Sequence, residues 1–139
     1  MINARAYSTL QYEVGSIADS AITITPGTAL KISKMPISPI TKVSDQYYNV
    51  SVASSGDEVN GVVALSGNIS DSVAGRMVLL NSGFIPVLLA DTFKKGDHLK
   101  PTIGGKWTKG MTGDQVFVEL MEDGAKDSLA WGRPDIETL

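Results

Sequence analysis

The chain has 139 residues, of which 42% are hydrophobic and 19% charged, a length and apolar content that suit one compact domain with an ordinary core. Fifteen acidic residues outnumber twelve basic ones, giving a formal net charge of −3, so the basic surface that nucleic-acid binding requires is missing and we expect no nucleic-acid partner. Cysteine is absent, which excludes disulfides, thiolate nucleophiles and cysteine metal sites.

No apolar run approaches the about 20 residues that cross a bilayer, and the start of the chain lacks the apolar core of a secretory signal. We therefore expect no membrane partner and synthesis in a cytoplasm. Residues 1–22 are expected to form an N-terminal arm. Within it, Leu10, Val14 and Ile17 fall at helical spacing behind a Ser-x-x-Gln capping box, but a glycine and β-branched residues oppose a helix. A short helix and an extended arm therefore remain alternatives.

Residues 23–122 are expected to form the β domain, because apolar and polar residues alternate there in short runs broken by Gly, Asn, Asp and Pro. This pattern predicts a mainly β fold, a small antiparallel β-sandwich or barrel with short hairpins and little helix. One hairpin is expected from Tyr48–Val52 and Val59–Leu65. A second is expected from Met77–Leu80 and Phe84–Leu89, joined by a turn that contains a glycine.

Four local features refine the β domain. Pro86 cannot donate to a strand ladder, so its strand is expected at a sheet edge or at a bulge. Lys34–Asp45 carries two prolines and predicts an extended loop. Ser72–Arg76 is a candidate for a single helical turn. Gln115–Leu120, with sequence QVFVEL, alternates most regularly and predicts a strand.

A Gly-Asp pair recurs three times, as GDEV at Gly56, GDHL at Gly96 and GDQV at Gly113. The glycine permits a left-handed corner, and the aspartate can accept hydrogen bonds from backbone amides of the turn. The apolar residue two positions after the aspartate is expected to be the first side chain to enter the core. The pattern therefore predicts one turn that leads into a strand, used three times.

The stretch FKKGDHLKPTIGGKW contains the only histidine of the chain, His98. On a strand, the adjacent Asp97 would point to the opposite face, which opposes an Asp-His relay. No Gly-x-Ser-x-Gly elbow is present, the carboxylates show no metal-ligand spacing, and Gly-Gly-Lys lacks the spacing of a phosphate loop. We expect a protein that is not an enzyme, with no catalytic residue, metal site, cofactor or small-molecule substrate.

Residues 123–139 are expected to form a C-terminal tail that follows the last strand. The tail mixes acidic residues with Leu129, Trp131, Ile136 and Leu139. A free tail has no need of these apolar side chains, so it either packs on its own domain or grips a neighbouring subunit.

The order of these motifs resembles the small β-rich head decoration, or capsid cement, proteins of tailed bacteriophages. The resemblance covers roughly residues 55–132 and rests on turn chemistry and β alternation. The matching positions are Gly61–Val63, Gly83–Leu88, Gly96–Leu99 with Gly104-Gly105, and Val116–Leu120.

The resemblance implies a structural virion protein on the capsid exterior that binds the expanded capsid and stabilises it by bridging capsomers. Its partner would be the major capsid protein, and it would form a homotrimer or another homo-oligomer. Terminal arms would clamp adjacent capsomers, which makes these residues the candidates for capsid or subunit contact: Tyr7, Leu10, Tyr12, Val14, Ile17, Trp131, Ile136 and Leu139.

Three alternatives remain open from sequence. A carbohydrate-binding or adhesion module on a virion or cell surface would use Trp107 and the tyrosines as stacking platforms, although a tryptophan on a strand more often packs in a core. A structural protein of the phage tail or neck would show the same β pattern. A small hydrolase or isomerase would need His98 as its base.

Overall fold

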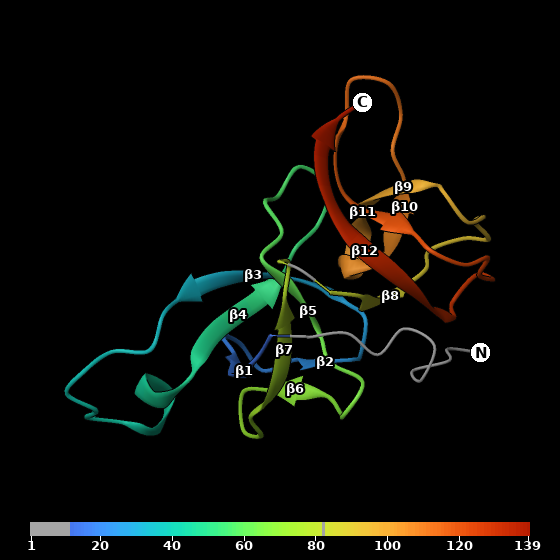
Figure 1. Cartoon of the computed structure of the whole chain (residues 1–139). Coiled ribbons are helices and arrows are strands. Elements are labelled where there is room, and N and C mark those ends of the chain that lie inside the picture. Colours follow the sequence, from blue (N-terminus) through green and yellow to red (C-terminus); the bar gives the residue numbers. More distant parts are fainter. Residues whose placement is uncertain (1–11, 82) are drawn as a thin grey trace.

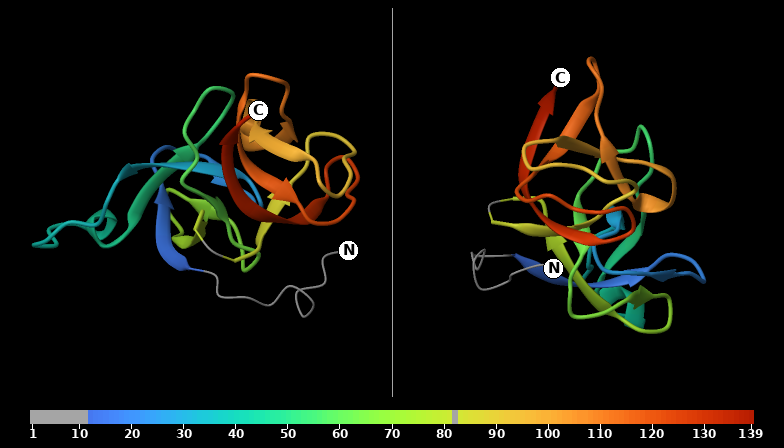
Figure 2. Two further views of the ribbon diagram at one scale, coloured as in Figure 1. Left: turned by 45° about the horizontal axis from the view of Figure 1, so that its top comes forward. Right: turned by 90° about the vertical axis from the view of Figure 1, so that its right-hand side faces the viewer.

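The computed structural model describes residues 12–81 and 83–139, which form two β bodies side by side (Figures 1 and 2). The first body is a closed barrel with strand order β1-β4-β3-β5-β7. Its strands are β1 (Glu13–Ala18), β3 (Ala29–Lys34), β4 (Tyr48–Val52), β5 (Gly61–Val63) and β7 (Gly75–Leu79). A two-stranded sheet of β2 (Thr23–Ile24) and β6 (Ile69–Ser70) accompanies the barrel.

The second body is a five-stranded sheet with order β10-β9-β11-β12-β8. Its strands are β8 (Ile85–Leu88), β9 (His98–Pro101), β10 (Trp107–Lys109), β11 (Gln115–Leu120) and β12 (Leu129–Thr138). An isolated bridge pairs Leu89, directly after the edge strand β8, with Trp107 of the other edge strand, β10. Helix in the described residues is limited to the 3-10 turns η1 (Val43–Gln46) and η2 (Ile103–Gly105). The predicted fold class, mainly β with little helix, is confirmed.

The buried apolar side chains form two clusters. Neighbouring residues of one strand belong to different clusters, because successive side chains of a strand point to opposite faces. Leu30 and Val63 belong to the cluster inside the barrel, whereas their neighbours Ala29 and Val62 belong to the cluster between the barrel and the second sheet. All four side chains are fully buried. The barrel wall is therefore buried on both faces where it meets the second sheet, so these strands cannot show a simple apolar-polar alternation.

Gly27 and Trp107 form the centre of the junction between the two bodies. The Gly27 carbonyl accepts hydrogen bonds from the Leu88 amide at 3.0 Å and from Trp107 Nε1 at 3.1 Å. The φ angle of Gly27 is +82°, and a Cβ at this position would lie 2.7 Å from the Leu88 nitrogen. Only glycine combines this backbone conformation with so close an approach of the second sheet.

The three predicted Gly-Asp turns are confirmed. Each glycine has a positive φ, and each aspartate side chain accepts a hydrogen bond from the amide three residues before it. The acceptor and donor pairs are Asp57 with Ser54 at 2.9 Å, Asp97 with Lys94 at 3.0 Å, and Asp114 with Met111 at 2.8 Å. In each of these turns the aspartate amide also donates to the carbonyl three residues before it, and the same backbone bond closes two further turns, from Thr28 to Thr25 and from Ser128 to Ala125. One turn chemistry therefore introduces strands in both bodies.

Both predicted hairpins are wrong. β4 and β5 are not neighbours, because β3 lies between them and pairs antiparallel with each. β7 closes the barrel against β1, whereas β8 pairs with β12 in the second sheet, so the turn that includes Gly83 connects the two bodies. β4 also pairs parallel with β1, which departs from the all-antiparallel expectation. Short connections predicted these pairings, whereas β5, whose three residues are all buried, lies between β3 and β7.

The predicted arm and tail boundaries are corrected at both ends. β1, within the predicted arm of residues 1–22, is a barrel strand with Ile17 only 8% exposed, so the helical alternative is wrong there. The earlier part of the arm lies outside the described residues. β12, within the predicted tail of residues 123–139, is the longest described strand and lies between β11 and β8. Of the two alternatives for the tail, packing on its own domain is therefore the one observed.

Three of the remaining local predictions agree with the structure and one is wrong. Pro86 lies in β8, an edge strand, as predicted. The predicted loop of Lys34–Asp45 is irregular until η1 begins at Val43, and β11 coincides with the predicted Gln115–Leu120. The predicted helical turn at Ser72–Arg76 is wrong, because a bend leads directly into β7. Within the described ranges, no helix has the length and apolar character to cross a bilayer.

Candidate functional site

The β3–β4 loop, residues 35–47, projects from the barrel on the side away from the second sheet (Figures 1 and 2). It exposes four large apolar side chains: Met35 at 53%, Ile37 at 47%, Ile40 at 61% and Val43 at 64%. The other exposed large apolar residues of the described chain are scattered over several elements. We call these four side chains the apolar loop surface. Several exposed large apolar side chains in one projecting loop make that loop a candidate for a protein contact.

Asp45 gives the β3–β4 loop a defined shape from within. Its side chain is 1% exposed and accepts hydrogen bonds from the Thr41 amide at 3.0 Å, the Thr41 hydroxyl at 2.8 Å and the Lys42 amide at 3.1 Å. Lys34 Nζ lies 3.1 Å away and supplies the opposite charge. These bonds, the Thr41 amide first, hold the pKa of Asp45 well below its ordinary value. The carboxylate therefore stays charged and keeps the loop folded back on itself.

Asp45→Asn should destabilise the protein at neutral pH, by about tenfold in the folding equilibrium constant, because a buried acceptor of several donors loses its charge. A carboxylate whose pKa is lowered by folding stabilises the protein at pH values above the ordinary aspartate pKa of about 3.9. This stabilisation is lost as the pH falls below that value. Urea unfolding midpoints of the two proteins should thus differ at pH 7 and converge toward about pH 3. The exposed Asp71→Asn change is the control and should show no such convergence. An Asp45→Asn difference that does not depend on pH would contradict this role.

The predicted contact residues separate into three groups. Tyr7 and Leu10 lie outside the described residues. Ile17 and Trp131 are buried in the fold of their own chain, at 8% and 3% exposure, so they are not available to a partner. Tyr12 and Ile136 are exposed, and Val14 and Leu139 are half-buried. Sequence reasoning missed the apolar loop surface, although apolar residues on either side of the prolines of a predicted loop were a usable signal.

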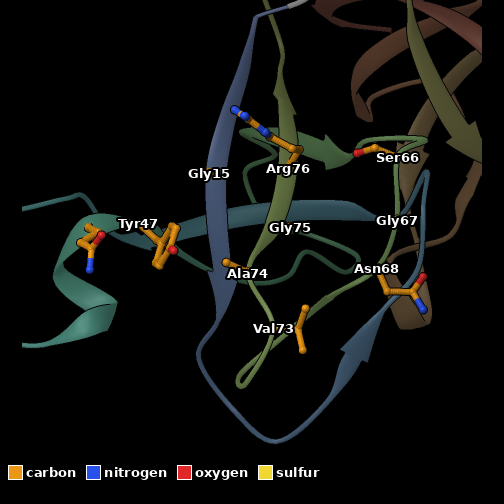
Figure 3. Close-up of a pocket in the computed structure, with 10 residues that line it drawn as sticks. Gly15, Tyr47, Ser66, Gly67, Asn68, Val73, Ala74, Gly75 and Arg76 are labelled. Carbon is orange, nitrogen blue, oxygen red and sulfur yellow. The ribbon is translucent and has the colours of Figure 1, made fainter.

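A groove of about 700 Å³ lies beside the barrel, where η1 and the loops around β6 approach β1 and β7. Figure 3 shows Tyr47 near η1, Arg76 on β7, and Asn68 and Val73 on the loops that flank β6. Gly15 lets the Tyr47 ring approach β1, because a Cβ at Gly15 would lie 3.2 Å from Tyr47 Cδ1. Arg76 is the only ionisable group other than Tyr47 among the lining residues. Small and neutral polar residues therefore make up most of the groove lining, and Arg76 is its charged side chain.

The alternative role of Trp107 as a stacking platform is wrong, and the favoured packing of this tryptophan in a core is confirmed. Its side chain is fully buried, and Nε1 donates to the Gly27 carbonyl. A glycan cannot stack on a ring that is inside the core. Tyr47 and Tyr48 are half-buried, which leaves Tyr12 as the exposed tyrosine of the described chain.

His98 lies on β9, and its Nδ1 is 3.3 Å from Oδ2 of Asp135 on β12. Asp97 does not pair with His98. It accepts from the Lys94 amide and lies 3.5 Å from Lys109 Nζ, as the opposite faces of a strand require. Sequence reasoning missed Asp135 because this residue fell in the predicted tail, and only the pairing of β12 with β11 brings it near β9.

No protein-family model matches the chain, and no curated protein matches its sequence. A solved structure does match, that of the N base of head fiber gp8.5 in bacteriophage phi29, with a TM-score of 0.69. The match covers 94% of this chain and 98% of that chain, at 15% sequence identity. The two chains therefore share a fold over almost their whole length.

Proposed function

We propose that this chain is a structural protein of a tailed-bacteriophage virion that binds the outer surface of the expanded capsid and stabilises it by bridging capsomers. The observation that carries the proposal is the fold match with a phage head-fiber base over 94% of the chain. Fold alone does not establish function. The sequence resemblance to head decoration proteins supports the same role from turn motifs and strand patterns.

The proposed partners are the major capsid protein and further copies of this chain, in a homotrimer or another homo-oligomer. The proposed role requires no catalytic group. A protein that binds only the expanded lattice stabilises it by mass action, because binding lowers the free energy of that state alone.

The apolar loop surface is the proposed capsid contact. It stands at one end of the molecule, and Asp45 orders its loop before binding. Pre-ordering reduces the conformational entropy that association would otherwise cost. β1 and β12 are strands of the folded domain and are not available as arms. An N-terminal arm that clamps a capsomer would therefore consist of the residues before Tyr12.

The proposal is tested with purified protein and with capsid shells of the parent phage, prepared before and after expansion and without decoration. We expect co-sedimentation with expanded shells, saturation at one copy or one trimer per local symmetry axis, and a higher melting temperature of the decorated shell. Equal binding to unexpanded shells, or binding to purified tails and not to heads, would contradict the capsid-stabilising role.

A second candidate is the base of an appendage on the head, which the description of the matching structure favours. Such a base would occupy head sites without bridging capsomers, so it would bind unexpanded and expanded shells equally. The same experiment therefore separates the two roles, because binding is compared on shells prepared before and after expansion.

A further inference from the structure

The outer face of the second sheet carries a row of polar side chains across three strands. His98 of β9 pairs in register with Glu119 of β11, which pairs in turn with Arg133 of β12. Asp135 and Glu137 follow Arg133 on β12, and their carboxylates lie close to the His98 ring. An imidazole and two carboxylates from distant parts of the sequence therefore meet on one rigid surface.

A bulge in β12 lies beside this group. Val116 pairs with Glu137 and Val118 pairs with Pro134, so β12 contributes one more residue than β11 over this interval. A bulge bends its strand and re-aims the neighbouring side chains, and bulges are common beside functional sites. Asp135 is within the bulged interval, and its carboxylate reaches His98, which is two strands away.

The contacts of His98 are unusual for an ion pair. Nδ1 lies 3.3 Å from Asp135 Oδ2, yet this nitrogen is buried and makes no hydrogen bond. One ligand atom from each of His98, Asp135 and Glu137 lies within 4.8 Å of the other two. Two ligands of one tetrahedral zinc ion are roughly 3.3–3.5 Å apart, given metal-ligand distances near 2.1 Å. The imidazole and carboxylate are therefore separated as two ligands of one cation are.

The charges around the group leave room for a cation. Glu119, Asp135 and Glu137 face one guanidinium, Arg133, which is hydrogen-bonded to Glu119. Asp135 is also close to His98 and is only 22% exposed. Three carboxylates of this group thus share Arg133, with His98 beside Asp135, and a divalent ion would balance the remaining negative charge.

We propose that His98, Asp135 and Glu137 bind one divalent transition-metal cation, with Zn²⁺ as the representative ion. Imidazole selects ions of this class over Mg²⁺ and Ca²⁺, which prefer oxygen ligands alone. The site connects β9 to the end of β12 across β11, so its role is structural, and the remaining coordination positions are open to water. The inference is independent of the capsid-binding role.

The test uses the full, tag-free chain, in which His98 is the only imidazole. ZnCl₂ is titrated while the ring signals of His98 are followed by NMR and the heat of binding by calorimetry. We expect one ion per chain, a shift of the ring signals and a higher melting temperature with Zn²⁺ than with Mg²⁺. Ring signals that do not respond at millimolar Zn²⁺ would overturn the proposal.

Variants distinguish a three-residue site from binding by a single histidine. His98→Gln, Asp135→Asn and Glu137→Gln should each weaken Zn²⁺ binding by about tenfold or more, with unchanged circular dichroism. Glu58→Gln, at an exposed position on the other body, is the matched control and should leave affinity unchanged. Unaltered Zn²⁺ affinity in both carboxylate variants would show that His98 binds the ion alone, and it would overturn the proposed three-residue site.

Discussion

Trp107→Ala is expected to lower the free energy of unfolding by about 3–5 kcal/mol, the range for a fully buried aromatic side chain. Trp107 is 0% exposed, belongs to the cluster between the two bodies and donates to the Gly27 carbonyl. The substitution removes both the packing and the hydrogen bond at the junction. The whole free energy of unfolding of a small domain is only about 5–15 kcal/mol, so the variant should be close to unfolding at 37 °C.

Urea denaturation followed by circular dichroism measures this effect. Trp107→Phe keeps most of the ring, and the Gly27 carbonyl still accepts from the Leu88 amide, so we expect a loss of only about 1–2 kcal/mol. Ile103→Ala, at a side chain that is 86% exposed, should change stability by less than about 0.5 kcal/mol. If Trp107→Ala costs no more than Ile103→Ala, the junction does not depend on this residue.

Replacing Ile40 and Val43 together with aspartate is expected to weaken binding to expanded shells by about 100-fold. These side chains are 61% and 64% exposed and make no core contact that the change would remove. Burial of each in an interface contributes about 1.5 kcal/mol or more, which is about tenfold in affinity. The introduced carboxylates would also have to be desolvated, which opposes binding further.

The matched control is Ile103→Asp, which places the same charge at another exposed isoleucine, on the second body. Co-sedimentation should show normal binding for this control and impaired binding for the double variant, with equal urea midpoints for both. Normal shell binding by the double variant would remove the apolar loop surface from the proposed interface and leave the rest of the proposed function standing.

Local features of the fold could be predicted from sequence because their causes are local. The turn at Gly96 depends on a positive φ and on one aspartate side chain, both encoded within four residues. β11 follows from six alternating residues, and the edge position of β8 follows from the missing amide of Pro86. In each case a short window contains every group that decides the structure.

Strand pairing could not be predicted, because it depends on residues far apart. β1 pairs with β4 and β7, and β12 pairs with β8 and β11. The apolar residues of both terminal segments, such as Ile17 and Trp131, therefore suggested binding to a partner when they pack in their own core. An unpaired apolar segment has the same sequence pattern whether its partner is in the same chain or in another.

The candidate sites were also hidden by distance. The group of His98, Asp135 and Glu137 exists only because β11 pairs with strands on both sides. The apolar loop surface was missed for a different reason. A prediction from sequence assigns apolar residues to the core and cannot identify those that stay exposed to solvent. Its exposure follows from the hydrogen bonds of Asp45, which fold the loop onto itself and not onto the barrel.

The closure of the barrel has a consequence for association between copies. The barrel has no free strand edge, whereas the second sheet keeps β10 and β8 as its edges, which the Leu89–Trp107 bridge links at one point. Unpaired edges are the places where identical chains extend one another's sheets and aggregate. The barrel therefore offers no strand edge for another copy to extend, and contacts made through the barrel are left to side chains.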